Sequence, residues 1–254
     1  MKRNGISIQI YEDKEQASVA VAQRMGELIT AKQALGKKAV LGLATGATPI
    51  GVYKELIRLH REEGLSFQNV ITFNLDEYYP MQPASDQSYV AFMQQQLFAH
   101  IDIPAENINI PDGTLGQEVV DTYCEAYEQK IANAGGLDIQ LLGIGRTGHV
   151  GFNEPGSTAD SLTRLVTLNE VTRQDAASAF DGLENVPTQA ITMGVGTIAK
   201  AKNIILMAWG EKKAEIVKKA LEGEITTEVP ATFLQKLEGV EFILDKEAAG
   251  RIDG

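Results

Sequence analysis

The sequence predicts an α/β fold with a single doubly wound, mostly parallel sheet and helices on both of its faces. Short apolar runs of strand length alternate with longer amphipathic patterns, which is typical of parallel strands joined by crossover helices. Hydrophobic residues make up 44% of the 254 residues, enough for a sizeable core. No Pro- or Ser-rich linker interrupts the pattern, so we predict one domain over residues 1–254.

The apolar runs give the strands of this Rossmann-like sheet. In chain order they are Ser7–Tyr11, Lys38–Leu43, Val70–Asn74, Asp138–Gly143, Arg164–Leu168, Ala190–Met193, Asn203–Ala208 and Glu241–Leu244. Helical patterns lie between most of them, over residues 13–35, 50–63, 87–100, 115–133, 194–201 and 211–222. The region 150–190 is the least regular. Irregular segments of this length are usually functional or disordered, so this region is long enough to be a lid.

Charge and cysteine content narrow the class of protein. The formal net charge is −11, which argues against nucleic acid and anionic membranes as partners. An anionic substrate would therefore need local donors. The single cysteine, Cys124, allows no disulfide within the chain. No apolar run has the length of a membrane span, and no signal peptide follows Met1, so we expect a cytoplasmic protein.

Two adjacent acids, Asp76 and Glu77, end the buried run Val70–Phe73. Open α/β sheets bind their ligands beyond the carboxyl ends of the strands. An acid at that edge is a candidate general base.

A Gly/Thr loop, Gly42–Pro49, joins a predicted strand to a predicted helix. Free backbone N–H groups at a helix start attract phosphate, and threonine hydroxyls add donors. The candidate phosphate ligands are Ala44, Thr45, Gly46, Ala47 and Thr48. The alternative is an ordinary strand-to-helix turn in which Thr48 is the N-cap.

Residues 143–148 match the pattern G-x-G-x-x-G after a strand, and Glu170 lies where a dinucleotide fingerprint would place its acid. That fingerprint needs a helix directly after the turn. Gly151 and Pro155 argue against one, so we predict a glycine-rich loop that shapes a pocket, in preference to an NAD site.

His149 lies within this loop, and Glu154 follows five residues later. A histidine oriented by a carboxylate is the usual acid–base arrangement at neutral pH. The alternative is a histidine that only holds the loop by hydrogen bonds. No second histidine or cysteine lies at ligand spacing, so no metal is expected. Lys213 follows the strand Asn203–Ala208 at a helix start, where a bound anion would suit a lysine.

Together these segments closely resemble the glucosamine-6-phosphate deaminase (isomerase) family, nearly end to end. The matching motifs are Gly42–Pro49, Phe73–Tyr78, Ser88–Met93, Ile103–Asn109, His149–Pro155, Gly194–Thr197 and Gly210–Ala214. The most specific are Asn-Leu-Asp-Glu-Tyr and Phe-Asn-Glu-Pro. The related 6-phosphogluconolactonases lack Phe-Asn-Glu-Pro after their glycine-rich core.

The resemblance implies the sugar-phosphate isomerase/deaminase fold and the conversion of glucosamine 6-phosphate to fructose 6-phosphate and ammonia, in amino-sugar catabolism. It implies that Asp76 moves a proton between C2 and C1, and that His149, oriented by Glu154, opens the pyranose ring. The Thr45–Thr48 loop and Lys213 would hold the phosphate, and the region around residues 168–190 would form a mobile lid. Proton transfer of this kind needs a base and polar groups but no cofactor. A homo-oligomer is compatible with the resemblance, since relatives range from monomers to hexamers.

The chain departs from the family pattern at three places. Thr147 stands where most members have a catalytic aspartate, so we expect a less stabilised imidazolium at His149. Ser178 stands where the family usually has a phosphate-binding arginine, and Arg146 or Arg173 is a candidate substitute. Ser157 and Arg164 match allosteric positions of some members, but Val166 replaces their lysine.

Three alternatives to a glucosamine-6-phosphate deaminase remain open at this stage. The first is a deaminase for the galactosamine epimer, and the second is a lactonase-like hydrolase. The third is a non-catalytic sugar-phosphate sensor, since effector domains of some repressors share this fold. Retention of Asp76, His149 and Glu154 favours catalysis, because a pure binder has no need of a base at a strand end.

Overall fold

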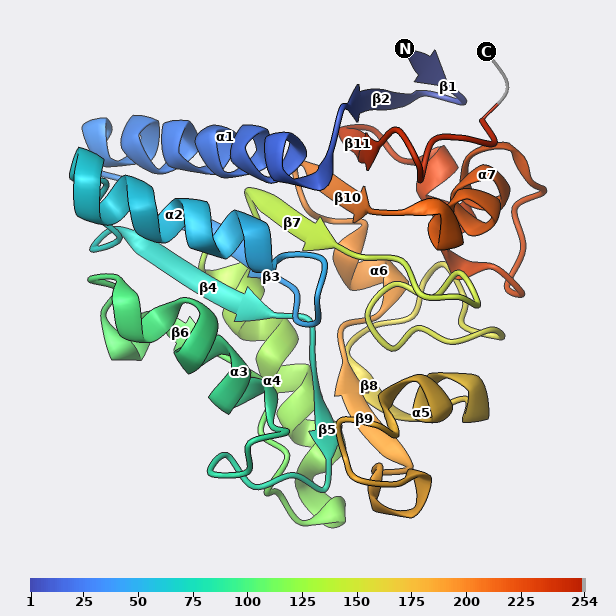
Figure 1. The fold of residues 1–254 in the computed structure, drawn as a ribbon. Coiled ribbons are helices and arrows are strands. Elements are labelled where there is room, and N and C mark those ends of the chain that lie inside the picture. The colour runs from blue at the N-terminus through green and yellow to red at the C-terminus, as the bar shows by residue number, and fades with distance from the viewer. Residues whose placement is uncertain (253–254) are drawn as a thin grey trace.

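The computed structural model describes residues 1–252, so the last two residues of the predicted domain lie outside the described part. An eight-stranded sheet forms the centre of the molecule (Figure 1), in the order β1-β2-β11-β10-β7-β3-β4-β6. Only β1 is antiparallel to its neighbour. The bounds are β1 Lys2–Arg3, β2 Ile6–Tyr11, β3 Ala39–Leu43, β4 Val70–Asn74, β6 Ile108–Asn109, β7 Ile139–Leu142, β10 Ile204–Ala208 and β11 Val240–Asp245. The predicted α/β class and mostly parallel sheet are confirmed.

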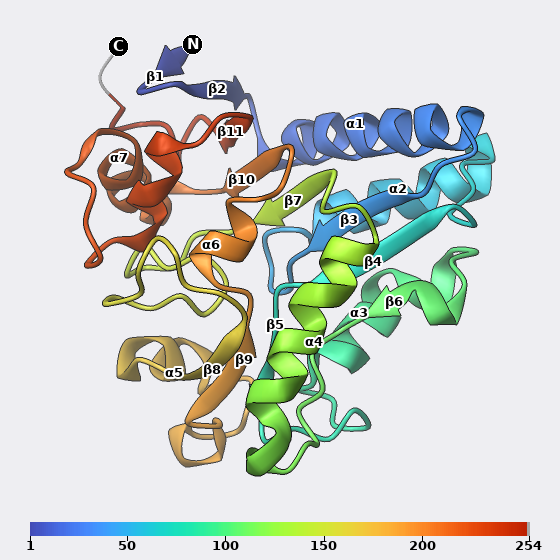
Figure 2. The same ribbon diagram turned by 180° about the vertical axis from the view of Figure 1, so that it is seen from behind.

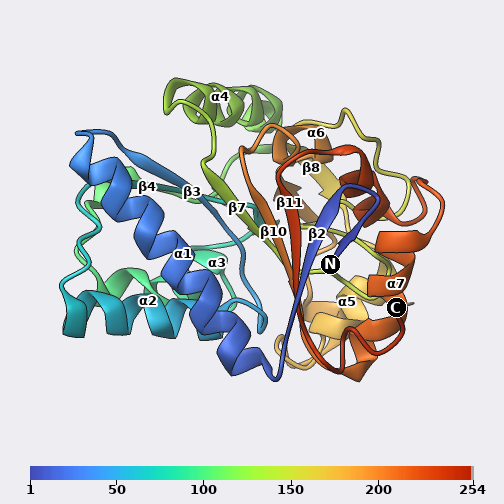
Figure 3. The same cartoon turned by 90° about the horizontal axis from the view of Figure 1, so that it is seen from above.

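Helices cover both faces of this sheet, as Figure 3 shows. One face packs against α1 Lys14–Ala34, α2 Ile50–Glu63 and α3 Tyr89–Gln96, and the other against α4 Val120–Asn133, α6 Val195–Ile198 and α7 Ala214–Glu222. Side chains alternate between faces along each strand. Val40 therefore joins one core cluster and Leu41 the other, and both are buried. Cys124 is buried in α4.

A second, three-stranded antiparallel sheet lies beside the first, in the order β5-β9-β8 (Figure 2). Its strands are β5 Asp76–Tyr79, β8 Arg164–Thr167 and β9 Gln189–Thr192. Both β8 and β9 match predicted strands, but β9 pairs with β5 and β8 pairs with β9, so neither joins the main sheet. The seven-residue helix α5, Glu170–Ala176, packs next to this small sheet.

Leu75 is the residue at which the chain passes from one sheet to the other. Its N–H donates to Leu43 O (3.0 Å) on β3, and its carbonyl accepts from Met193 N (2.7 Å), just after β9. Both sheets therefore hold the backbone directly before Asp76. This fixes the position of the candidate base. In residues 1–252, no helix combines the length and apolarity needed to cross a membrane.

Candidate active site

The loops after β3, β4 and β7 meet at the carboxyl edge of the main sheet, where α/β folds bind ligands. They enclose a cavity of about 180 Å³. Its lining consists of Ala44, Thr45, Gly46, Ala47, Thr48, Leu75, Asp76, Tyr89, Gly143, Ile144, Gly145, His149, Gly151 and Phe152. A larger hollow of about 880 Å³ lies between α1 and the end of α2. It contains no histidine and lies at no strand end, so the smaller cavity is the better candidate for chemistry.

Asp76 is the first residue of β5 and only 6% exposed. Burial raises the pKa of its carboxyl group to about 8, and the charge of Glu77 adds to the increase. Burial raises the pKa values of Tyr53 and Tyr127, and the nearby charge of Asp76 adds to the increase. A carboxylate in so apolar a position is a stronger base than an exposed one.

Glu77 faces away from this cavity, since successive side chains of a strand point to opposite sides. It is 1% exposed and accepts hydrogen bonds from the N–H groups of Tyr89 (2.8 Å) and Val90 (3.2 Å). These groups begin α3, so Glu77 stabilises the start of that helix. Burial raises the pKa of Glu77 to about 7, although the hydrogen bonds oppose the increase. The two adjacent acids thus have separate roles.

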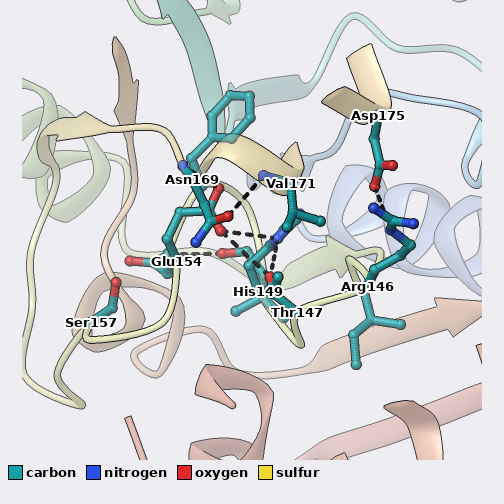
Figure 4. Close-up of polar contacts among 12 residues, drawn as sticks. Arg146, Thr147, His149, Glu154, Ser157, Asn169, Val171 and Asp175 are labelled. Atoms are coloured by element: carbon teal, nitrogen blue, oxygen red, sulfur yellow. Dashed lines mark hydrogen bonds and ion pairs between the residues drawn. The ribbon is translucent and has the colours of Figure 1, made fainter. Parts of the chain in front are cut away.

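His149 lies with Thr147 and Glu154 in the loop after β7 (Figure 4). Its Nδ1 is 2.8 Å from Thr147 Oγ1 and 3.3 Å from Glu154 Oε2. With hydrogen on Nδ1, the ring can donate to either oxygen. Burial raises the pKa of Glu154, but hydrogen bonding to His149 and its charge outweigh burial and hold that pKa below its usual value. This is the histidine–carboxylate pair that the sequence predicts.

Two glycines let the imidazole and the carboxylate approach the cavity. A Cβ atom at Gly145 would lie 2.0 Å from His149 Cε1, so a side chain there would displace the ring. At Gly151, where φ is +57°, a Cβ would lie 3.3 Å from Asp76 Oδ2. No helix follows this turn before α5, so the predicted pocket-shaping loop is confirmed and a dinucleotide fingerprint is absent.

The loop 44–48 borders the cavity at the start of α2, as predicted. Gly46 has the left-handed φ of +86° that a tight turn requires. The alternative role of Thr48 as the N-cap is wrong: Pro49 is the N-cap and no side chain caps the helix. Thr48 instead accepts a hydrogen bond at its carbonyl from Trp209 Nε1 (3.0 Å).

Lys213 does not line the cavity but lies behind it, in the 3₁₀ turn Glu211–Lys213. Its Nζ donates to Ile144 O (2.7 Å), the carbonyl of a lining residue. The side chain is half-buried, and burial lowers its pKa. The ammonium group therefore contacts the cavity wall through the Ile144 carbonyl.

The two candidate arginines occupy different environments. Arg173, on α5, donates from Nη2 to Leu183 O (2.9 Å) and Val186 O (3.0 Å), which ties the helix to the following turn. Arg146 is exposed, and its Nε lies 3.0 Å from Asp175 Oδ2 (Figure 4). Arg164 donates to Asn153 and Ser157, so the two matched allosteric positions contact each other.

Sequence reasoning assigned no role to Tyr89 or Phe152, yet both line the cavity. Their rings stack with centroids 6.1 Å apart and planes 7° from parallel. Ser88, the side-chain N-cap of α3, was the available signal that Tyr89 begins a helix near the site. Among residues 1–252, no group of three or more His, Cys, Asp or Glu side chains could hold a metal ion.

A family model described as glucosamine-6-phosphate isomerases/6-phosphogluconolactonase matches residues 12–242. A glucosamine-6-phosphate deaminase from Bacillus velezensis is 47% identical over 97% of this chain and 99% of its own. A deaminase-like protein from Bacteroides thetaiotaomicron is 44% identical over 96% of this chain, which spans only 37% of that longer relative.

Among solved structures, a monomeric glucosamine-6-phosphate deaminase superposes with a TM-score of 0.92 and 43% sequence identity. The match covers 97% of this chain and 100% of the other. Since the family model spans most of the sequence and a 47% identical relative is covered almost completely, the chain belongs to the glucosamine-6-phosphate isomerase/6-phosphogluconolactonase family.

Proposed function

We propose that this chain is a glucosamine-6-phosphate deaminase, which converts glucosamine 6-phosphate and water to fructose 6-phosphate and ammonia. The observation that carries the proposal is the shared cavity of Asp76 and His149, bordered by the Thr45–Thr48 loop. A base, a ring-opening group and a phosphate cradle then face one substrate. The Bacillus velezensis relative and the monomeric deaminase structure have the same activity by name.

The reaction begins with ring opening. His149, held by Glu154 and Thr147, passes the O1 proton to the ring oxygen as the C1–O5 bond breaks. The open-chain aldehyde then lies within reach of Asp76. The Asp76 carboxylate takes the C2 proton, and the electron pair moves to form the C1–C2 double bond of an enolamine. The carbonyl oxygen at C1 gains a proton.

In the second half of the reaction, Asp76 returns the proton that it took from C2. Asp76 delivers it to C1, where the electrons of the C1–C2 double bond form the new C1–H bond. The nitrogen lone pair forms the C2–N double bond of an iminium, and C1 keeps its hydroxyl group. Water adds to C2, and ammonia leaves to give fructose 6-phosphate. The N–H groups at the start of α2, the Thr45 and Thr48 hydroxyls and Lys213 hold the phosphate. No step needs an organic cofactor or a metal, because a placed base and polar groups suffice.

The direct test is ammonia release from glucosamine 6-phosphate and from galactosamine 6-phosphate, with lactone hydrolysis measured in parallel. We expect turnover of the glucosamine epimer. Preferred turnover of galactosamine 6-phosphate would move the assignment to that epimer, and lactone hydrolysis without ammonia release would favour a lactonase. Tight binding of both sugars without turnover would identify a sensor. The raised pKa of Asp76 weighs against a sensor, because a binder gains nothing from a buried base.

Glu77→Gln is expected to move the pH dependence of kcat/KM. The raised pKa of Asp76 places the ascending limb of the wild-type profile near pH 8. Removing the neighbouring charge lowers the pKa of Asp76, so the limb should move to lower pH by roughly one unit. A pH profile of both proteins checks this. An unmoved limb in a folded Glu77→Gln protein would contradict electrostatic coupling of the two acids.

Thr147 marks a second difference in acid–base chemistry, since the family resemblance places an aspartate there. Thr147→Asp adds a negative charge beside the imidazole, because Thr147 Oγ1 lies 2.8 Å from His149 Nδ1. A neighbouring carboxylate favours the imidazolium. The limb of the pH–rate profile that depends on His149 should therefore move to higher pH in this variant. A profile identical to the wild type would refute this role of Thr147.

We also propose that residues 1–254 act as one domain and that the segment 168–190 is a mobile lid. Support comes from the polar contacts that tie it to the loop after β7, which stand beside an apolar cluster of Leu168 and Val186 with Phe152. Asn169 N donates to Glu154 Oε1 (3.4 Å), and Asp175 pairs with Arg146. Hydrogen exchange with and without fructose 6-phosphate tests the lid. Amides of α5 should be protected by the ligand, and equal exchange would argue against a lid.

A further inference from the structure

Two cationic side chains, Lys213 and Arg146, lie close enough for their charges to interact. Lys213 donates to the carbonyl of Ile144, and Arg146 follows two residues later in the same loop. Burial lowers the pKa of Lys213, the charge of Arg146 lowers it further, and Asp175 opposes the decrease. The three charges therefore influence one another. In a chain with net charge −11, such a pair is a local attraction for an anion.

Arg146 is not held in place by burial. Its side chain is 58% exposed, and its Asp175 partner is 46% exposed. Figure 4 shows the guanidinium turned toward Asp175 on α5, away from His149. An exposed ion pair of this kind contributes little to stability, because water screens it. A guanidinium can instead bind a phosphate by two parallel hydrogen bonds, which is a stronger interaction.

Arg173 cannot serve the same purpose without breaking the turn after α5. Its Nη2 donates to two backbone carbonyls, Leu183 O and Val186 O. Moving this side chain to a ligand would leave both carbonyls to find other partners. Arg173 therefore holds the backbone that follows α5, whereas Arg146 is free to move to a ligand.

We propose that Arg146 is a second cationic ligand of the substrate's 6-phosphate, beside Lys213, and that Asp175 holds it in reserve until the phosphate arrives. This inference rests on the proposed function for the identity of the substrate. Ile144 and Gly145, which precede Arg146, line the cavity. A rotation of the long Arg146 side chain would bring its guanidinium to the end of the cavity formed by the Thr45–Thr48 loop. The phosphate then replaces Asp175 as the partner of Arg146.

The exchange has a consequence for α5. That helix contacts the catalytic loop through Asn169, whose N–H reaches Glu154, and through Asp175. When Arg146 moves to the phosphate, the second contact is released while the first remains. Occupation of the phosphate end would therefore change how α5 is held, next to the histidine that opens the ring.

Opposite effects of two variants test the proposal. Arg146→Gln removes the ligand and should weaken binding of fructose 6-phosphate at least tenfold by calorimetry, and raise the KM for glucosamine 6-phosphate similarly with kcat changed less than threefold. Arg146→Lys should recover part of the loss. Asp175→Asn frees the arginine and should leave binding unchanged or tighten it, by up to about fivefold. Lys212→Gln, which removes one charge from the adjacent exposed lysine, is the matched control and should change binding less than twofold.

Two results would overturn the proposal. Equal weakening by Arg146→Gln and Asp175→Asn, with no further loss in the double variant, would mean that the two residues act only as a latch. A loss in Arg146→Gln no greater than in Lys212→Gln would reduce Arg146 to a contribution to net charge. Binding of inorganic phosphate and fructose 6-phosphate needs no turnover. If the wild type released no ammonia while Arg146→Gln still lost affinity, the proposed function would fail and the role of Arg146 would stand.

Discussion

Asp76→Asn is expected to lower the rate of ammonia release from glucosamine 6-phosphate by about 10²–10⁴-fold, the usual contribution of a general base. Asparagine keeps the shape of the side chain but cannot accept the C2 proton. The phosphate contacts lie elsewhere, so binding of fructose 6-phosphate should change little. Steady-state kinetics with a calorimetric binding measurement checks both parts. Asp86→Asn, which alters an exposed loop acid, should behave as the wild type.

The same substitution should stabilise the fold at neutral pH. Folding raises the pKa of Asp76 to about 8, above its value in the unfolded chain. The folded state therefore holds a proton that the unfolded chain releases, and wild-type stability falls as pH rises from about 4 to 8. Asparagine removes this decline. Relief of about 1–2 kcal/mol would raise Tm by roughly 2–8 °C at pH 8, and an unchanged or lower Tm would contradict the inferred burial penalty.

His149→Asn is the second variant expected to have a large effect, again about 10²–10⁴-fold on ammonia release. The imidazole is the group placed to move a proton between O1 and O5, and an amide cannot both accept and return it. Glu154→Gln should give a smaller loss, because Thr147 Oγ1 still contacts the ring. The ratio of the two effects, measured as kcat/KM, separates the proton carrier from the residue that orients it.

His149→Asn should also affect stability through Glu154. The imidazole helps to hold the pKa of this buried carboxyl below its usual value. Such a group contributes stability above its unfolded pKa, and the contribution is lost as pH falls through the folded pKa. Without its partner, the carboxylate stays buried and less satisfied, at a cost of roughly 1–3 kcal/mol near neutral pH. Thermal unfolding at pH 7 tests this, and an unchanged Tm would mean that the pair contributes nothing to the fold.

The alternation of strands and helices could be predicted from the sequence, because parallel strands buried on both faces are almost wholly apolar. The predicted runs match β2, β3, β4, β7, β10 and β11 within a residue or two. Strand pairing was harder to predict. Nothing in the apolar pattern shows that the chain turns at Leu75, so that residues 76–79 leave the main sheet. The hydrogen bonds that fix this turn come from Leu43 and Met193, far away in sequence.

The site could be predicted where chemistry and backbone position coincide, as for Asp76 and His149. Details that tertiary packing sets could not be predicted. The division of labour between Asp76 and Glu77 depends on where α3 begins, and the N-cap of α2 is Pro49 although threonine has the higher preference. The ion pair of Arg146 could not be predicted either, because its partner Asp175 lies on a helix 29 positions later.

Solvent deuterium at C1 of the product is the measurement closest to the central claim, that Asp76 carries the proton from C2 to C1. In D₂O the wild type should place deuterium at C1 of fructose 6-phosphate during ammonia release, read by proton NMR, because the proton that Asp76 takes from C2 exchanges with solvent before Asp76 delivers a hydron to C1. Asp76→Asn should do so at least a hundredfold more slowly while still binding the product. Incorporation at the wild-type rate in that variant would show that another group moves the proton.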